Sequence, residues 1–176
     1  MEKKLKYAKF TVEQIQNIEE SWDILQPMYW TVNIYGTYEE YLKSAESFTI
    51  EQRYLLAVNW YFMEVNNGGH YQFFANYTGI VWEDALNGFK YFGMIEFASN
   101  FQKVVEYFGG IIPFDREERW NILEKLEEDN EKEFFDILDK ADDFIYKYEG
   151  EENELNYIKA NPEKFVFEGE YWGYGF

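Results

Sequence analysis

The sequence contains no cysteine, one histidine and only three prolines among its 176 residues. Without cysteine there is no disulfide, no thiolate nucleophile and no zinc site of the cysteine-rich kind. No apolar run approaches the roughly 18 residues that a membrane-spanning helix needs. The lysine-rich start, MEKKLKYAKF, is not followed by the apolar stretch of a secretion signal. These absences predict a protein without a membrane segment, located in a reducing cytoplasm.

Basic residues are also scarce, because 16 lysines and arginines stand against 34 aspartates and glutamates, a formal net charge of −18. A surface this acidic repels nucleic acid and anionic membranes and attracts basic partners. Aromatic residues make up 22% of the chain, which is ample apolar material for a core and argues against disorder. We therefore expect one folded acidic domain that binds neither DNA nor a membrane directly.

The spacing of apolar residues, every three to four positions, predicts an all-α fold. Thr11 with Gln14, and Thr49 with Gln52, are typical of helix starts at which two side chains cap each other's backbone. Pro27 is expected to end the first helix. We predict a compact helical domain over residues 1–164 and an aromatic, glycine-rich, non-helical tail over 165–176 that packs on the body or on a partner. The predicted helices cover residues 11–26, 38–44, 50–66, 71–76, 82–91, 95–107, 115–128, 131–148 and 152–160.

The stretch NNGGHYQFFANY, residues 66–77, places two glycines at the end of a predicted helix. A left-handed residue, expected at Gly68, would turn the chain there. Gln72 and Asn76 lie four apart and are expected to satisfy backbone carbonyls at this corner. No lysine, serine or threonine follows the glycines as in a phosphate-binding loop. We interpret the stretch as a structural corner, with a ligand-binding site as the alternative. Its motif residues are Asn67, Gly68, Gly69, Gln72, Phe73, Phe74 and Asn76.

His70 is the only histidine that could act as a general base, and Glu64 is the nearest acid in sequence. We interpret His70 as a partly buried residue at a turn and expect its replacement by phenylalanine to be tolerated. No nucleophile–base pair, no Glu-x-x-His motif and no calcium-binding loop pattern can be identified. The chain is therefore predicted to be no enzyme and to bind neither metal nor cofactor.

The same stretch resembles the signature of the DNA-mimic protein domain family. The resemblance consists of EVN at residues 64–66, NGG at 67–69, QFF at 72–74 and Asn76, and it extends more weakly from about residue 49 to residue 162. In that family the residue after the glycines is commonly phenylalanine, so His70 departs from the pattern. The resemblance implies a helical fold and mimicry of DNA towards DNA-binding proteins.

Acidic residues are concentrated between Asp115 and Glu154, where 17 acids stand against 6 bases. In the helix predicted over 131–148, an apolar stripe implies that the acids on the other face point to solvent. Carboxylates at three-to-four spacing lie about 5–6 Å apart, comparable to successive phosphates of a DNA strand. The alternative is that these acids only keep the protein soluble. The predicted partner-binding face consists of Glu117, Glu124, Glu128, Asp136, Asp139 and Asp143.

The leading hypothesis is therefore a non-enzymatic DNA mimic that occupies the nucleic-acid-binding surface of a basic protein such as a transcription factor. An immunity protein that blocks a basic nuclease toxin is an alternative of the same class. A small hydrolase or ligand-binding protein is an alternative of another class, and a deep polar pocket at His70, Gln72 and Asn76 would favour it. The sequence leaves the oligomeric state open, a homodimer included.

Overall fold

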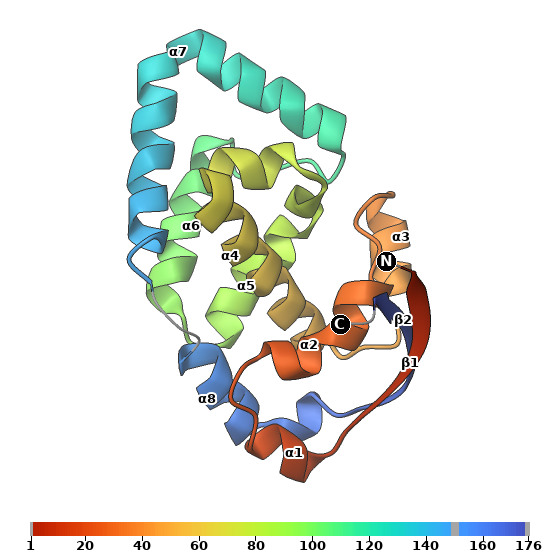
Figure 1. The fold of residues 1–176 in the computed structure, drawn as a ribbon. Helices are drawn as coiled ribbons and strands as arrows, with labels where there is room; N and C mark the ends of the chain where they lie inside the picture. The colour runs from red at the N-terminus through yellow and green to blue at the C-terminus, as the bar shows by residue number, and fades with distance from the viewer. Residues whose placement is uncertain (1, 149–151, 175–176) are drawn as a thin grey trace.

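The computed structural model describes residues 2–148 and 152–174, and these are mainly helical, which confirms the all-α prediction (Figure 1). The helices predicted over 38–44, 82–91, 95–107 and 152–160 have the predicted bounds. The elements are β1 (Lys3–Phe10), α1 (Val12–Gln16), α2 (Trp22–Thr31), α3 (Tyr38–Ser44), α4 (Ile50–Ala75), η1 (Tyr77–Val81), α5 (Trp82–Tyr91), α6 (Ile95–Tyr107), α7 (Arg116–Ile145), α8 (Glu152–Ala160), η2 (Pro162–Lys164) and β2 (Phe167–Tyr174).

The centre of the fold is α4, which contacts α2, α5, α7 and η1 (Figure 1). Its consecutive residues 55–58 are all at most 1% exposed, so this stretch of the helix is buried on every side. The Tyr61 ring lies within 5.2 Å, between centroids, of the rings of Phe73, Phe89 and Phe101. Aromatic pairs at this separation add about 0.5–1.5 kcal/mol each beyond the area they bury. The core is therefore an aromatic cluster around α4.

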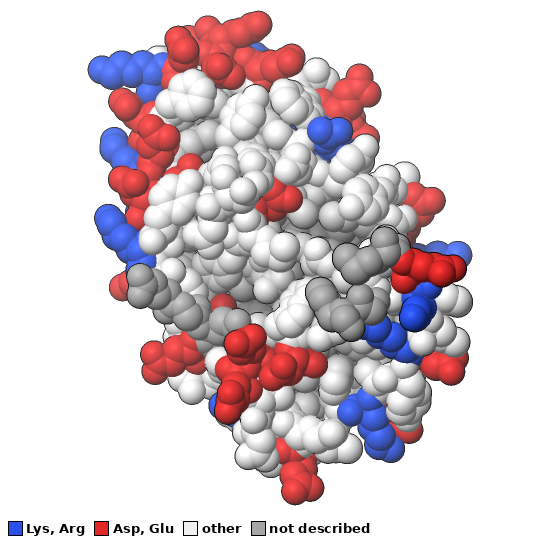
Figure 2. Space-filling model, in the orientation of Figure 1, with Lys and Arg blue, Asp and Glu red and all other residues white. Residues whose placement is uncertain are grey.

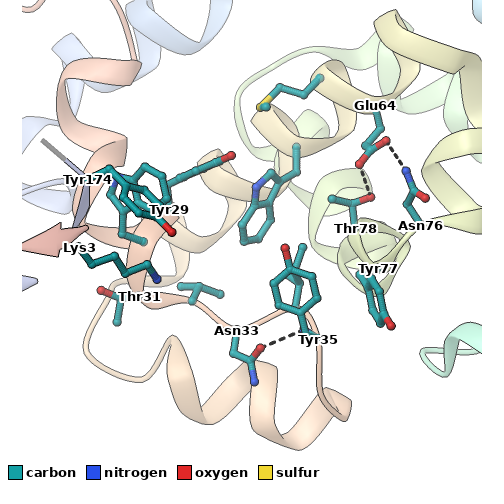
Figure 3. Close-up of a pocket in the computed structure, with 15 residues that line it drawn as sticks. Lys3, Tyr29, Thr31, Asn33, Tyr35, Glu64, Asn76, Tyr77, Thr78 and Tyr174 are labelled. Carbon is teal, nitrogen blue, oxygen red and sulfur yellow. Dashed lines mark hydrogen bonds between the residues drawn. The ribbon is translucent and has the colours of Figure 1, made fainter. Parts of the chain in front are cut away.

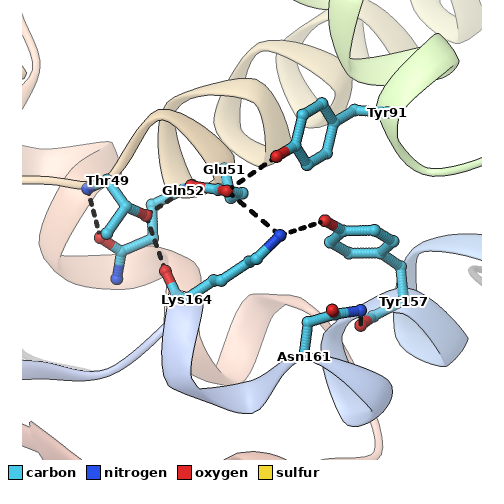
Figure 4. Close-up of polar contacts among 7 residues, drawn as sticks. All are labelled: Thr49, Glu51, Gln52, Tyr91, Tyr157, Asn161 and Lys164. Atoms are coloured by element: carbon cyan, nitrogen blue, oxygen red, sulfur yellow. Dashed lines mark hydrogen bonds and ion pairs between the residues drawn. The ribbon is translucent and has the colours of Figure 1, made fainter.

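The start of α4 is tied to the C-terminal segment (Figure 4). Thr49 and Gln52 form the predicted capping box, with each backbone N–H donating to the other side chain at 2.9 and 3.1 Å. The Thr49 hydroxyl also donates to the carbonyl of Lys164 at 2.7 Å. The Lys164 ammonium donates to the Tyr157 hydroxyl at 2.9 Å and lies 3.4 Å from the Glu51 carboxylate. One helix start therefore holds a segment more than one hundred residues away.

A two-stranded antiparallel ribbon joins the two ends of the chain, with Lys3 opposite Tyr174 and Phe10 opposite Phe167 (Figure 1). The Lys9 ammonium lies 2.8 Å from the Glu168 carboxylate across the ribbon. An isolated two-stranded ribbon is marginal in water, but β2 packs on α2. The tail predicted as non-helical therefore contains a strand, and its partner is an N-terminal strand that helical periodicity did not predict. Residues 175–176 of the tail lie outside the described residues.

The prediction that Pro27 ends the first helix is wrong. The predicted helix over 11–26 is divided into α1 and α2, and Pro27 lies inside α2. The side chain of Asn17 donates to the carbonyl of Glu13 at 2.7 Å and closes α1 early. Proline removes one helical hydrogen bond, and here that bond would have been to the carbonyl of Asp23, an exposed residue of the first turn.

The two acidic helices predicted over 115–128 and 131–148 are the two arms of α7, which bends at Asn130 (Figure 1). The backbone of Asn130 is extended, with φ −161° and ψ 79°. Its side-chain oxygen accepts from the N–H of Glu133 at 3.3 Å, so Asn130 acts as the N-cap of the second arm. The first arm covers residues 116–129 and the second covers 131–145. The bend sets the direction in which each arm presents its acids.

Candidate protein-binding surface

The second arm of α7 packs on the body through Phe134, Leu138, Ala141 and Ile145, each at most 5% exposed. On the first arm, Leu123 is buried, and Trp120 and Leu126, three residues to either side of it, are half-buried. Because a helix turns once in 3.6 residues, these positions direct the acids at the remaining positions to solvent. Both arms are therefore amphipathic, as the apolar stripe of the helix predicted over 131–148 indicated for the second.

Ten acids of α7 are exposed, against three exposed lysines, Lys125, Lys132 and Lys140. Figure 2 shows them along the top and the upper left edge of the molecule, where α7 runs. Among the residues that the structure describes, none of the ten forms a salt bridge. The ten acids, called the acidic face below, are Glu117, Glu118, Glu124, Glu128, Asp129, Glu131, Glu133, Asp136, Asp139 and Asp143.

The charge density of the acidic face is close to that of a nucleic-acid strand. Thirty helical residues extend about 45 Å, so ten carboxylates give one charge per about 4.5 Å. DNA carries one charge per about 3.4 Å of axis along each strand. When the three exposed lysines are subtracted, the net charge per unit length of α7 falls further below that of a DNA strand. The surface therefore resembles one strand more closely than a duplex.

All six acids of the predicted partner-binding face are exposed, but they do not form one straight line. Glu117, Glu124 and Glu128 lie on the first arm, whereas Asp136, Asp139 and the more distal Asp143 lie on the second. Within each arm the spacing of three, four or seven residues keeps the carboxylates on one side of the helix. The arms meet at the bend at Asn130, so the acids form two lines that enclose an angle.

The acidic face has a boundary on the side of the second arm that faces α6. A hollow of about 670 Å³ lies there, with Val104, Ile137 and Phe144 among its lining residues. Three lysines also line it, namely Lys103, Lys140 and Lys147. These lysines would repel a basic partner, which favours its approach to the acids of α7 from the outer side.

The glycine corner of α4 receives α7. The left-handed residue is Gly69, at φ +72°, whereas Gly68 is extended at φ −159°, so the expectation for Gly68 is wrong. A Cβ on Gly69 would lie 2.9 Å from Cγ of Asp142, a residue of the second arm of α7. Only glycine combines this backbone conformation with so close an approach. The corner therefore fixes the position of the acidic helix.

His70 is wholly buried, not partly buried as predicted, and its partner is Asp142 and not Glu64. The backbone N–H of His70 donates to Asp142 Oδ1 at 2.9 Å, and ring Nδ1 contacts the same oxygen. Ring Nε2 lies 2.6 Å from the Tyr61 hydroxyl. Burial raises the pKa of Tyr61 well above its usual value, so the hydroxyl keeps its proton. A carboxylate can only accept, so Nδ1 donates to Asp142, and Nε2 of the neutral imidazole accepts from the Tyr61 hydroxyl.

Arginines of α7 cap the end of α4. The prediction that the amides of Gln72 and Asn76 would satisfy the carbonyls there is wrong. The Arg119 guanidinium donates to the carbonyls of Phe74 and Asn76, both at 2.9 Å. Arg116 donates to the carbonyl of Ala75 at 2.7 Å. Burial lowers the pKa of Arg119 to about 10, which still leaves it charged at neutral pH. A cation is favourable at this end of a helix, where the carbonyl dipoles point.

The amides of Gln72 and Asn76 donate instead to the Glu64 carboxylate, at 2.7 and 2.9 Å, and the Thr78 hydroxyl donates to it at 2.9 Å. Glu64, Asn76 and Thr78 line a groove of about 710 Å³. Neither His70 nor Gln72 lines that groove, so the structure does not bring together the polar pocket that the hydrolase alternative requires. The glycines and amides that predicted the corner did not predict the groove, because most residues that line the groove come from segments distant in sequence.

In the described part of the chain, no three histidines, aspartates or glutamates are grouped so that they could hold a metal ion. No helix there is long and apolar enough to cross a membrane.

The fold and the surface define a class: a helical protein whose bent, acidic helix docks on a glycine corner of the central helix. The chain belongs to the DMP19-like protein family, the DNA-mimic family that the signature resembles, and the family model matches residues 46–161. The match covers 116 of 176 residues, from just before α4 to the end of α8, and leaves out the ribbon, α1, α2, α3 and η2. Searches of curated proteins and of solved structures gave no significant match.

Proposed function

We propose that this protein is a DNA mimic, and that its acidic face occupies the nucleic-acid-binding surface of a basic protein such as a transcription factor. The observation that carries the proposal is the row of ten exposed carboxylates on α7, none of them neutralised by a salt bridge among the described residues. Membership of the DMP19-like family supports the same function. Lysines and arginines that bind phosphates would meet carboxylates at similar spacing.

Rigidity of the acidic helix supports the proposal further. The second arm is held by a buried apolar stripe and by the contact of Asp142 with His70, and the first arm is held through Arg119. Because the arms are fixed before a partner arrives, binding orders fewer groups and costs less conformational entropy. A solubilising surface has no need for this degree of support.

We further propose that the protein acts by binding and not by catalysis. The only histidine is 0% exposed, and both of its ring nitrogens have partners in Tyr61 and Asp142. A general base must reach a substrate proton directly or through one water molecule. The hydrogen-bond network around His70 serves instead to attach α7 to α4.

The test is competition with DNA for one partner. A pull-down at low salt, followed by mass spectrometry, is expected to recover a basic nucleic-acid-binding protein, and duplex DNA is expected to displace that protein from the acidic chain. Binding should weaken as salt rises, because charges are screened over about 8 Å at physiological ionic strength. The salt dependence should be shallower than that of DNA, which also releases condensed counterions.

A complex that forms with DNA still bound to the partner would contradict mimicry, because the two ligands would then occupy different surfaces. Recovery of a basic nuclease in place of a transcription factor would identify the protein as an inhibitor of that nuclease.

A further inference from the structure

Figure 3 shows the groove that contains Glu64, and none of the groove's lining residues in the described part of the chain belongs to α7. Its walls come from α2 and the following residues, from α4, from η1 with the residue before it, and from the ends of β1 and β2. Glu64 and Lys3 are its only two charged lining residues in the part of the chain that the structure describes, and Figure 3 shows them at opposite ends. Its aromatic lining consists of Tyr29, Trp30, Tyr35, Trp60, Tyr77 and Tyr174.

The carboxylate of Glu64 is oriented but not neutralised. Oε2 accepts from Gln72 and Asn76, whereas Oε1 accepts from Thr78 alone. All three donors are uncharged, and among the described residues no lysine or arginine forms a salt bridge with Glu64. A carboxylate oxygen can accept two hydrogen bonds, so Oε1 can take one more donor. A half-buried negative charge in this arrangement favours a cationic donor.

Aromatic rings lie beside this carboxylate in the lining of the groove. The rings of Tyr35 and Tyr77 are 5.0 Å apart, edge to face, and Trp60 of α4 is 5% exposed. Tyr35 is 72% exposed and Tyr77 is 42% exposed, so both rings are accessible to a molecule in the groove. Burial first, and then Tyr35 and Glu64, raise the pKa of Tyr29, so its ring stays uncharged.

Three of these aromatic rings already lie close to cations of the chain itself. The Lys3 ammonium lies 5.9 Å from the ring centroid of Trp30 and 5.8 Å from that of Tyr174, at the far end of the groove. The Arg116 guanidinium lies 4.6 Å from the Tyr77 ring, and Arg116 does not line the groove. Between these contacts, no cation of the described chain is recorded over Tyr35 or Trp60.

We propose that the Glu64 end of the groove is a binding site for an organic cation, that is, a guanidinium or alkylammonium group. The cation donates to Oε1 of Glu64 and packs against the rings of Tyr35 and Trp60. Aromatic rings beside a carboxylate bind such groups, because the ring face and the carboxylate both carry negative potential and attract a cation. The site does not depend on mimicry by α7, so either proposal can fail without the other.

The probe is N-acetyl-arginine amide, and its matched control is N-acetyl-citrulline amide, which has the same shape without the charge. Binding is followed by NMR through the indole N–H signals of Trp30 and Trp60, both of which line the groove. The arginine compound is expected to shift the Trp60 signal in a saturable way, and to bind at least about tenfold more tightly than the citrulline compound. Equal binding of the two would overturn the proposal, because charge would then have no role.

Four variants, two of them controls, test where the cation binds. Glu64→Gln should weaken arginine binding about tenfold, whereas Glu106→Gln, the same charge change on an exposed residue of α6, should leave it unchanged. Tyr35→Leu should weaken binding roughly threefold through loss of the ring face. Tyr35→Phe keeps the ring and should bind like wild type. Because Tyr35 is 72% exposed, its variants test the site even if Glu64→Gln fails to fold. Full affinity in Tyr35→Leu would overturn the assignment of the ring.

A peptide with one central arginine, compared with a citrulline peptide of the same sequence, shows whether the cation is a side chain of another protein or a free small molecule. If the groove recognises a side chain of another protein, the peptide should bind more tightly than the single amide, because the rest of the groove can contact its backbone. If the groove recognises a free small molecule, the two should bind equally. Tighter binding of the citrulline peptide than of the arginine peptide would contradict both.

Discussion

At the scale of single residues, the acidic helix is positioned by one contact between segments that are 72 residues apart in sequence. Gly69 lets α4 approach α7 closely, and Asp142 accepts from both the backbone and the ring of His70. The sequence allowed a turn to be predicted at the glycines because Asn-Gly pairs are common helix ends. It gave no indication that Asp142 would be the partner, since only tertiary packing brings the two together.

Replacing Gly69 with alanine is expected to lower the free energy of unfolding by about 2 kcal/mol or more. A left-handed backbone costs an alanine about 1 kcal/mol, and the new Cβ would also displace Asp142. Gly93→Ala is the matched control, because Gly93 has φ +74° and nothing within 4 Å of the added Cβ. Urea unfolding should show a clearly smaller loss for Gly93→Ala. Equal losses would mean that the approach of Asp142 has no energetic consequence.

The replacement of His70 by phenylalanine, which seemed tolerable from the sequence, is expected to destabilise the protein by about 2 kcal/mol or more. It leaves the Tyr61 hydroxyl without its buried partner and removes the ring donor of the Asp142 carboxylate, which keeps only the backbone N–H of residue 70, and an unsatisfied buried group costs about 1–3 kcal/mol. Tyr61→Phe, which removes only one hydroxyl, should cost less. Urea unfolding measures both variants. A His70→Phe protein as stable as wild type would show that this network adds nothing to stability.

At the scale of elements, local signals were sufficient where neighbours in sequence decide the structure. The bounds of α3, α5, α6 and α8 were predicted from apolar spacing within each segment, and of the four α3 begins at a capping box, formed by Thr37 and Glu40. The ribbon could not be predicted in this way, because β1 pairs with a strand more than 150 residues further on. The same reason applies to the groove, whose aromatic walls come from several separate segments.

The bend in α7 gives a prediction at this scale. Asn130→Ala removes the side-chain oxygen that caps the second arm, and loss of such a cap costs about 1 kcal/mol. We expect urea unfolding to show that the free energy of unfolding falls by this amount. Lys132→Ala, an exposed change two residues further on, should have an effect within about 0.5 kcal/mol. A variant without any loss at Asn130 would show that the arms are held in place by packing alone.

At the scale of the whole molecule, the family match and the charge distribution agree. The match covers α4 to α8, which includes both the glycine corner and the helix that carries the acidic face. The exposure of all six predicted acids could be predicted from helical periodicity, which is visible in the sequence. The angle between the two lines of acids could not be predicted, because it depends on the backbone conformation of Asn130. A partner must therefore fit a bent row of charges and not a straight one.

The most direct test of this account is the reversal of Asp136, Asp139 and Asp143 to lysine, measured as affinity for the basic partner. All three are exposed and lie opposite the apolar stripe, so we expect the melting temperature to change little and binding to be lost. The control reverses Glu19, Glu20 and Glu46, which are exposed and lie outside α7, and so changes the net charge equally. The control should keep most of the binding. If the α7 variant binds as tightly as wild type, or the control loses binding equally, these acids of α7 are not the surface that imitates DNA.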